Sequence, residues 1–584
     1  MATAMVSARK AIEDDILEHE KAIIDLKGRL NAMTTIARLP PELLSEIFLY
    51  VAKAAYEDPR AFYSRHYHSS GFYAWVSVTH VCRNWRAIAL NTPRLWGYVV
   101  VSRKVVVDEI LARSKKAPLL ISANVISTED ERSKVLKSIG QDASRLQELR
   151  LSGPVRVLQD VLRQFTEPSR TLERLVLSES IPPQYLTSDT SVPSMFQAQH
   201  PSLRYLELSR LVFSWNNSLL SSSGITHLKL VGRLDSQSML GIFDHLLSAI
   251  EQLPCLEVLD LEDAVPRLPD DTKTLPTPQR TISLSRLQRL SLSGNSLDCG
   301  NLLNHLSFPS GARLKFVGRG GVGATELLRV VSQHLARSEP LRSARLSRMY
   351  TGRIEANGWR EVLDPKRSKH PCIELQVDTL ACSSVASYLV NTSKMFTGVL
   401  NLDVESLDHD WRWKDVFSGM PDLRVLAVTG DPQEQFIQAI SATRKNRKNR
   451  PPTLVLPRLR VLKLSGTRMC SPDYDDPPEF LDKLEDWLIM RCNYDLPIHE
   501  LHLDNCLNLT EEDVERLDEV VPYVKWDRIV NFESEEEDEE VDDYDEYPYD
   551  DYDYDYGFDG DDFFWRSVGF LLSFATSTGN AVPS

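Results

Sequence analysis

The sequence predicts an α/β protein in which a short helical module is followed by an irregular repeat solenoid and a disordered acidic tail. Three observations predict this fold class. Apolar residues fall at helical spacing within residues 36–98, and the pattern L-x-x-L-x-L then recurs through residues 146–532. Residues 533–562 carry 18 acidic residues and no Lys or Arg. With 584 residues, the chain is long enough for several domains or one long repeat array.

Residues 1–35 show the pattern of a heptad helix. Apolar or near-apolar residues alternate four and three apart at Ile12, Ile16, His19, Ile23, Leu26, Leu30 and Met33. This seam is short for an independent coiled coil. It can pack back on the next module or pair with a second copy of the chain. His19 counts against the dimer, because a buried imidazole needs a polar partner.

Residues 36–98 predict a small helical module. Leu39-Pro40-Pro41-Glu42 places proline in the first turn of a helix, where its missing N–H costs nothing. The apolar residues at helical spacing in that helix are Leu43, Leu44, Ile47, Phe48 and Val51. Those of a second helical run are Val76, Val78, Val81, Cys82, Trp85, Ile88 and Leu90. A unit of this size buries a marginal core, so we expect an apolar face to remain for a partner.

This module resembles the F-box. The resemblance rests on LPPELLSEIF, then VCRNWRAIA, then LW, in that order, and covers about a tenth of the chain. The connection at residues 54–74 is longer than usual, as in fungal members of the family, and an ordinary helical hairpin is the alternative. The resemblance implies docking onto a Skp-type adaptor and, through it, a cullin. The adaptor-binding candidates that it implies are Leu39, Pro40, Leu43, Leu44, Ile47, Val81, Cys82, Trp85 and Leu95.

The repeat predicts a strand in each copy. Copies begin at residues 146, 172, 203, 225, 256, 287, 311, 341, 372, 397, 423, 459 and 498. The two leucines that flank one residue point to the same face of a strand, and stacked copies bury them together. Apolar spacing predicts helical return segments at residues 239–253, 325–336 and 480–490. A Rossmann-like sheet is the rival, but its strands would be more continuously apolar.

This repeat resembles the leucine-rich repeat, and the whole chain resembles F-box/leucine-rich-repeat substrate receptors. The resemblance implies a concave surface that binds a protein substrate. The residue between the two strand leucines should face it. The basic residues at this position predict a substrate-facing concave stripe of Arg150, Lys229, Lys315, Arg345 and Lys463.

The remaining segments connect or follow the repeats. Residues 99–145 read as a connector and N-terminal cap, and insertions fall at 268–280 and 444–452. The second insertion is a basic loop, which is a nuclear localisation signal, a phosphate-binding patch or a solvated loop. The acidic tract is predicted to be disordered. It serves as a solubilising tail or covers the basic stripe. The apolar residues at 563–574, within the segment 563–584, are too few to span a membrane and should dock on the last repeat or on a partner protein, with membrane attachment as the alternative.

Composition and motifs exclude several functions. The formal net charge is −16, and without the 18 acidic residues of the tract the rest is about +2, so we expect no nucleic-acid partner. Scattered cysteines without C-x-x-C predict reduced thiols in a cytoplasmic and/or nuclear protein. Neither a secretory signal nor a membrane span is apparent, so no membrane attachment is expected.

No catalytic motif is recognisable, and we expect neither an enzyme nor a cofactor. Residues 318–323 fit G-x-G-x-x-G, but Ala324 stands where a phosphate loop has lysine. A strand-to-helix turn is the simpler interpretation. The function that the resemblance to F-box/leucine-rich-repeat proteins implies is substrate recognition in a Skp–cullin–F-box ubiquitin ligase. The alternatives are an F-box scaffold outside any ligase and a nucleotide-regulated enzyme that uses the glycine loop.

Overall fold

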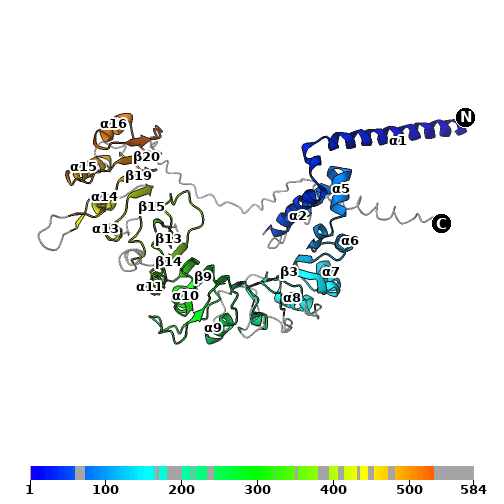
Figure 1. Ribbon diagram of the computed structural model, residues 1–584, viewed down its shortest axis with the longest axis horizontal. Helices are drawn as coiled ribbons and strands as arrows, with labels where there is room; N and C mark the ends of the chain where they lie inside the picture. Colours follow the sequence, from blue (N-terminus) through cyan, green and yellow to red (C-terminus); the bar gives the residue numbers. More distant parts are fainter. Residues whose placement is uncertain are drawn as a thin grey trace, which may run out of the picture. The chain divides into compact units, whose positions relative to one another are not determined.

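The computed structural model of the chain (Figure 1) is a mixed α/β structure with a helical N-terminal part. The described residues are 2–58, 73–163, 165, 170–180, 200–211, 215, 218–232, 243–320, 323–348, 353–378, 394–405, 413–430, 434–444, 453–470 and 480–531. The predicted acidic tract and apolar C-terminal segment lie outside these residues, as does the basic loop at 445–452. The chain divides into two compact units between Leu211 and Val212.

The first unit begins with helices. They are α1 (Ala2–Ala32), η1 (Thr35–Arg38), α2 (Pro41–Glu57), η2 (Ala74–Ser77), α4 (Val78–Val81), α5 (Arg83–Leu90) and η3 (Pro93–Gly97). Pro41 stands in the first turn of α2, as the sequence predicts. The second helical run is not continuous, because Cys82 is extended and separates α4 from α5.

A parallel ladder follows the helices in the same unit. Its strands pair in chain order and are β1 (Tyr98–Val100), β2 (Leu119–Asn124), β3 (Leu146–Gly153), β4 (Arg174–Glu179) and β5 (Tyr205–Ser209). Helices α6 (Lys104–Ser114), α7 (Glu131–Ile139) and α8 (Val155–Leu162) lie in the connections. The predicted connector at 99–145 thus contains two strands of the ladder. The repeat pattern missed β2, whose alternate residues are buried although they are not all leucine.

The second unit carries a longer ladder. From one end its strands are β6 (His227–Val231), β7 (Val258–Glu262), β9 (Arg289–Asn295), β11 (Arg313–Arg319), β14 (Ile373–Asp378), β13 (Arg353–Trp359), β12 (Ser343–Arg348), β15 (Asn401–Glu405), β16 (Val425–Thr429), β19 (Val461–Ser465), β20 (Glu500–Asp504) and β21 (Val524–Trp526).

Its helices are α9 (Phe243–Glu251), α10 (Ser296–Asn304), α11 (Ala324–Leu335), α13 (Trp413–Ser418), α14 (Glu434–Ile440), α15 (Phe480–Asn493) and α16 (Glu511–Val520). Three of them, α9, α11 and α15, coincide with the predicted return segments to within three residues at the ends of α11 and α15 and lie inside the segment at α9. Figure 1 shows α13, α14 and α15 along one side of strands β15, β19 and β20. Short pairs join β8 (Ile282–Ser283) to β10 (Leu306–Ser307) and β17 (Thr443–Arg444) to β18 (Thr453–Leu454).

The middle of this ladder departs from a simple succession of copies. β14 rather than β12 pairs with β11, and the antiparallel strand β13 lies between β14 and β12. The copies that begin at 341 and 372 are therefore not neighbours. Alternation of apolar residues determines which face of a strand is buried and carries no information about its neighbour in the sheet.

The repeat leucines form the core of the ladders. Leu149 and Leu151 in β3 and Leu259 and Leu261 in β7 are fully buried. Leu259 lies in register with Leu290 of β9. Each inward row therefore packs against the next, as the predicted repeat requires.

Candidate functional site

The helical part of the first unit has its own aromatic core. The rings of Phe48 and Trp85 lie 5.1 Å apart and connect α2 to α5. Trp75 and Trp96 meet edge to face at 5.3 Å, and the Trp96 indole N–H donates a 2.9 Å hydrogen bond to the Ala89 carbonyl. Phe48 belongs to the buried side of α2, so the opposite side of this helix faces outward.

The nine adaptor-binding candidates divide between this core and the surface. Leu44 and Leu95 are fully buried and therefore belong to the core. Leu43, Ile47 and Val81 keep 52%, 43% and 56% of their surface exposed, a high fraction for such side chains. Pro40 is exposed, and Leu39, Cys82 and Trp85 are half-buried. Adaptor contact by any of them stays a prediction.

Two further residues belong to the exposed face of α2. Tyr50 is 76% exposed, and Val51 is exposed as well. Both lie three to four residues beyond Ile47, which places them on the same side of the helix. Tyr50 was missed as a candidate, although the helical spacing from Ile47 would have found it.

Cys82 has a structural role at the start of α5. Its Sγ accepts a hydrogen bond from the Trp85 backbone N–H at 3.5 Å, so the side chain caps the helix. A small residue that accepts a hydrogen bond at this position satisfies a donor that the first turn leaves unpaired. The cap explains why the predicted continuous helix breaks here.

The helical part is tied to the ladder of the same unit. The Tyr73 hydroxyl donates to the Val100 carbonyl at 2.6 Å and accepts from the Val100 N–H at 2.9 Å. Arg150 of β3 donates to the Tyr56 carbonyl at 3.3 Å and lies 5.6 Å from its ring. Arg150 therefore joins the end of α2 to the strands, which its place in the predicted stripe did not suggest.

An ionised network surrounds this junction. Glu148 lies 3.7 Å from Arg150 and 3.6 Å from Arg174 of β4. Burial raises the pKa of Glu148, and the two arginines offset part of that shift. Burial also raises the pKa of Tyr56 well above its usual range. The network leaves the Arg150 side chain little exposed.

The remaining stripe residues lie on the second ladder. Lys315 lies 3.1 Å from Glu374 of β14, and Arg345 pairs with Asp403 at 3.4 Å and with Glu405. Lys463 lies 3.8 Å from Asp364, and Lys229 is half-buried in β6, in register with Asp260. Acidic neighbours therefore offset much of the positive charge along this row.

Two of these acidic neighbours were missed because their copies were placed two residues out of register. The pattern at 372 and 397 puts Gln376 and Asn401 at the middle position. The structure instead pairs Lys315 with Glu374 and Arg345 with Asp403. A two-residue shift keeps the buried face unchanged, so the apolar pattern cannot detect it.

The row borders a hollow of about 470 Å³ near its end. Its floor includes Lys463 and His502, and Lys525 extends the same row. The loop that follows β13 contributes Lys366 and Arg367 to the wall. Buried Asp403 also lines it, and burial raises the pKa of that carboxyl against the opposing charge of Arg345. The loop between β13 and β14 thus helps to form a hollow that is lined by both acidic and basic side chains.

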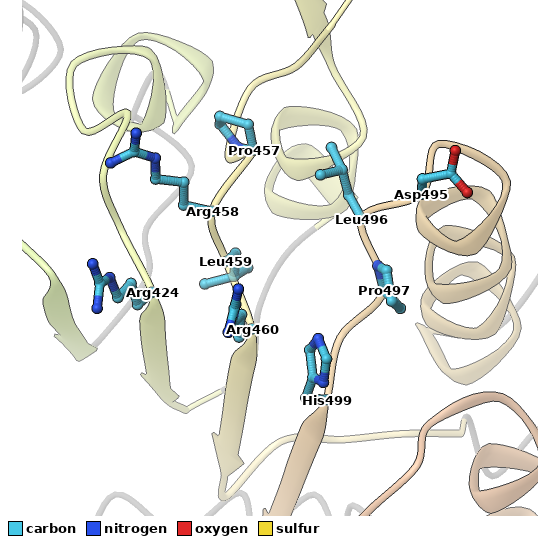
Figure 2. A pocket seen from close by; sticks show the side chains of 9 residues that line it. All are labelled: Arg424, Pro457, Arg458, Leu459, Arg460, Asp495, Leu496, Pro497 and His499. Carbon is cyan, nitrogen blue, oxygen red and sulfur yellow. The ribbon is translucent and has the colours of Figure 1, made fainter.

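A second cleft, of about 380 Å³, opens where three neighbouring strands begin. Figure 2 shows Arg424, Arg460 and His499 there, at the starts of β16, β19 and β20, with Asp495 on the far side. Backbone N–H groups of Arg460 and His499 donate to the carbonyls of Arg424 and Arg460 at 2.9 and 2.8 Å, which sets the three side by side. Arg458 is held by Asp422 at 2.6 Å.

Within the described part of the chain, neither Arg424 nor Arg460 forms an ion pair through its guanidinium. Two unpaired guanidinium groups on adjacent strands fit a carboxylate or a phosphate, which arginine binds through paired N–H donors. The sequence offers a weak signal for this cleft. Arginine recurs at the second position of the copies at 423 and 459.

The glycine loop has a packing role. Gly323 precedes α11 at φ +93°, and a Cβ there would lie 2.7–2.9 Å from the Leu297 backbone and side chain. Only glycine fits that conformation and that close approach. Arg319 of the same loop binds Asp263 at 2.7 Å.

In the described residues, no cluster of His, Cys, Asp and Glu is arranged to hold a metal ion. Nor does any helix there have the length and apolar character needed to cross a bilayer.

A small helical domain with an exposed apolar face, joined to the strand ladder of its own unit, defines a protein-interaction module. Residues 36–102 match the F-box-like family, so the chain contains an F-box-like domain. The bounds agree closely with the predicted 36–98. Such domains typically bind Skp-type adaptors. No curated protein matches the chain.

Proposed function

We propose that this protein is the substrate-recognition subunit of a Skp–cullin–F-box ubiquitin ligase. The F-box-like domain docks onto a Skp-type adaptor and, through it, a cullin. The ladders act as an irregular leucine-rich-repeat solenoid that binds a protein substrate. The chain itself catalyses no reaction in this function and needs no cofactor.

The exposed face of α2 carries the proposal. Leu43, Ile47, Tyr50 and Val51 all project from one side of a helix whose other side is fully packed. A cluster of exposed apolar side chains on so small a domain is typical of a protein interface. The match to the F-box-like family supports a Skp-type adaptor as the partner.

The junction between α2 and β3 supports a positioning role. Arg150 and Tyr73 fasten the helical part to the strands through hydrogen bonds to the Tyr56 carbonyl and the Val100 backbone. This attachment holds the adaptor-binding domain firmly on the strands of its own unit, and a substrate bound by the same chain is kept near the ligase machinery. Proximity of this kind makes a transfer between two macromolecules effectively intramolecular.

The substrate surface is proposed to lie on the second ladder. The hollow beside Lys463 and His502 and the cleft at Arg424 and Arg460 offer basic groups to an acidic segment of a protein. The predicted stripe contributes where acidic neighbours do not neutralise it. We place the protein in the cytoplasm and/or the nucleus.

Affinity purification of the full chain tests the adaptor role. Leu43→Asp with Ile47→Asp should abolish recovery of the adaptor and the cullin, because two charges would enter an apolar interface. Both positions are exposed, so the fold should survive. Lys104→Ala on α6 is the matched control outside the F-box-like domain. Wild-type recovery with the double variant would refute this docking face.

An F-box scaffold outside any ligase is the second candidate. The same purification separates the two, because a scaffold recovers the adaptor without a cullin. Substrate trapping with the intact complex, followed by mass spectrometry, would then identify what the ladders bind.

A further inference from the structure

The heptad seam of α1 is uncovered in the single chain. Figure 1 draws α1 as one uninterrupted helix. Its apolar seam residues are 51% to 78% exposed: Ile12, Ile16, Ile23, Leu26, Leu30 and Met33. An apolar stripe of this length on a helix is typical of an interface with another helix.

The spacing of the seam defines the flanking positions. With Ile16, Ile23 and Leu30 at position a of the heptad, Ile12, His19 and Leu26 stand at position d. Position e is then occupied by Glu13, Glu20 and Lys27, and position g by Asp15, Ala22 and Arg29. These side chains border the seam and decide which orientation a partner helix takes.

A parallel pair of α1 helices is disfavoured by these charges. In that arrangement, position g of one helix faces position e of the next heptad in the other. Asp15 would face Glu20 of the second copy, twice by symmetry, and Ala22 would face Lys27. The result is two repulsive contacts and no attractive one.

An antiparallel pair reverses the balance, because position e then faces e and position g faces g. Glu13 faces Lys27 of the second copy and Asp15 faces Arg29, each twice by symmetry. Glu20 and Ala22 each face the same residue of the second copy near the two-fold axis, so Glu20 makes the one like-charge contact. The apolar layers match as well, with Ile12 against Leu30 and Ile16 against Leu26.

We propose that α1 pairs with α1 of a second copy of this chain as an antiparallel two-stranded coiled coil. His19 packs against Ile23 in the two central layers, which weakens the pair and makes it dependent on concentration. The dimer is isologous and needs neither adaptor nor substrate. It brings two F-box-like domains and two substrate surfaces into one assembly, which strengthens binding to a partner with two sites.

Two charge variants of the full chain test the pairing by sedimentation velocity over the micromolar range. The acidic variant carries Lys27→Glu and Arg29→Glu, and the basic variant carries Glu13→Lys and Asp15→Lys. Each alone should dimerise at least about tenfold more weakly than wild type, because four attractive contacts become repulsive. An equimolar mixture should restore the dimer, because the acidic segment of one variant faces the basic segment of the other.

The control carries Lys10→Glu and Lys21→Glu, which changes the net charge as much as the acidic variant does but away from the seam. It should dimerise like wild type. A wild-type chain that stays monomeric over this range would overturn the proposal. So would an acidic variant that dimerises like the control, since a parallel pair leaves residues 27 and 29 without charged partners. A mixture that remains monomeric would overturn it as well.

Discussion

Arg491 is a buried cation that donates hydrogen bonds to three backbone carbonyls and lies 5.2 Å from the centre of the Trp487 ring. Its guanidinium donates to Leu496 at 2.9 Å, Leu456 at 3.1 Å and Leu459 at 3.0 Å. Burial lowers its pKa to about 10, so the group remains charged at neutral pH. One side chain of α15 thereby satisfies three carbonyls in the segments that lead into β19 and β20.

Arg491→Met should lower the free energy of unfolding by about 3 kcal/mol or more, because it leaves buried carbonyls without donors. Urea denaturation of the full chain measures the loss. Arg424→Met, at an exposed arginine, is the matched control and should change stability little. Equal effects of the two variants would contradict this role for Arg491.

Asp298 of α10 is a buried carboxyl that accepts a hydrogen bond from the Leu268 N–H at 2.8 Å. Burial raises its pKa from 3.8 to about 6, against the opposing effects of that hydrogen bond and of Arg267. Between these two pH values the folded state binds more protons than the unfolded state. Stability therefore falls as the pH rises through this window.

Asp298→Asn keeps the acceptor oxygen and removes the titration. Relative to wild type, the variant should gain up to about 3 kcal/mol of stability as the pH rises from 4 to 7. Thermal unfolding across that range provides the measurement, with Asp271→Asn, at an exposed carboxyl, as the control. If the stability of wild type and of Asp298→Asn changed equally with pH, the raised pKa of Asp298 would not affect folding.

At the scale of the element, each strand contributes its two inward residues to a core shared with its neighbours. Leu259 and Leu290 are fully buried and stand opposite each other in β7 and β9. The residues between the leucines, Asp260 and Ser291, are half-buried on the opposite face of the strands. The two faces of a strand should therefore tolerate substitution very differently.

Leu259→Ala and Leu290→Ala should each lower stability by about 2–5 kcal/mol, as cavities in a packed core. Their combination should be non-additive, because the two side chains line one shared space. Asp260→Asn and Ser291→Ala are the matched controls and should change stability little. Chemical denaturation of the four single variants and the double variant measures these losses of stability. Equal losses at leucine and control positions would contradict the predicted repeat register.

At the scale of the molecule, charge is distributed very unevenly along the chain. The tract at 533–562 carries 18 acidic residues, whereas the rest of the chain has a formal charge of about +2. In the part of the chain that the structure describes, the guanidinium groups of Arg424 and Arg460 in the second cleft form no ion pair. We expect the tethered acidic tract to compete with acidic ligands for such groups, because tethering gives it a high effective concentration.

Deletion of residues 533–562 should therefore raise the affinity of the protein for an acidic peptide at low salt. The gain should shrink at about 0.5 M salt, where exposed charges are screened over a few ångströms. Fluorescence anisotropy with a labelled peptide measures both conditions, and deletion of residues 563–584 is the control. Unchanged affinity at low salt would mean that the tract does not compete for these groups.

Much of this architecture was predictable from local sequence. Pro41 marked the start of α2, and the leucine pairs around Asp260 and Ser291 marked β7 and β9. Cap, turn and alternation signals of this kind depend on a few adjacent residues, so they are readable without the fold. The family resemblance of residues 36–98 was local in the same sense and agrees with the F-box-like match at 36–102.

Only the tertiary structure decided how these elements are used. It left Leu43 exposed and buried Leu44, and it placed β13 between β14 and β12. It also placed Glu374 and Asp403 next to the basic residues Lys315 and Arg345. It also turned Arg150 toward Tyr56. Each of these outcomes depends on which distant segment packs against a residue. The period of the apolar residues, two in a strand or 3.6 in a helix, determines which face of the element is buried. It does not specify which other element packs on that face, because this depends on residues far apart in the chain.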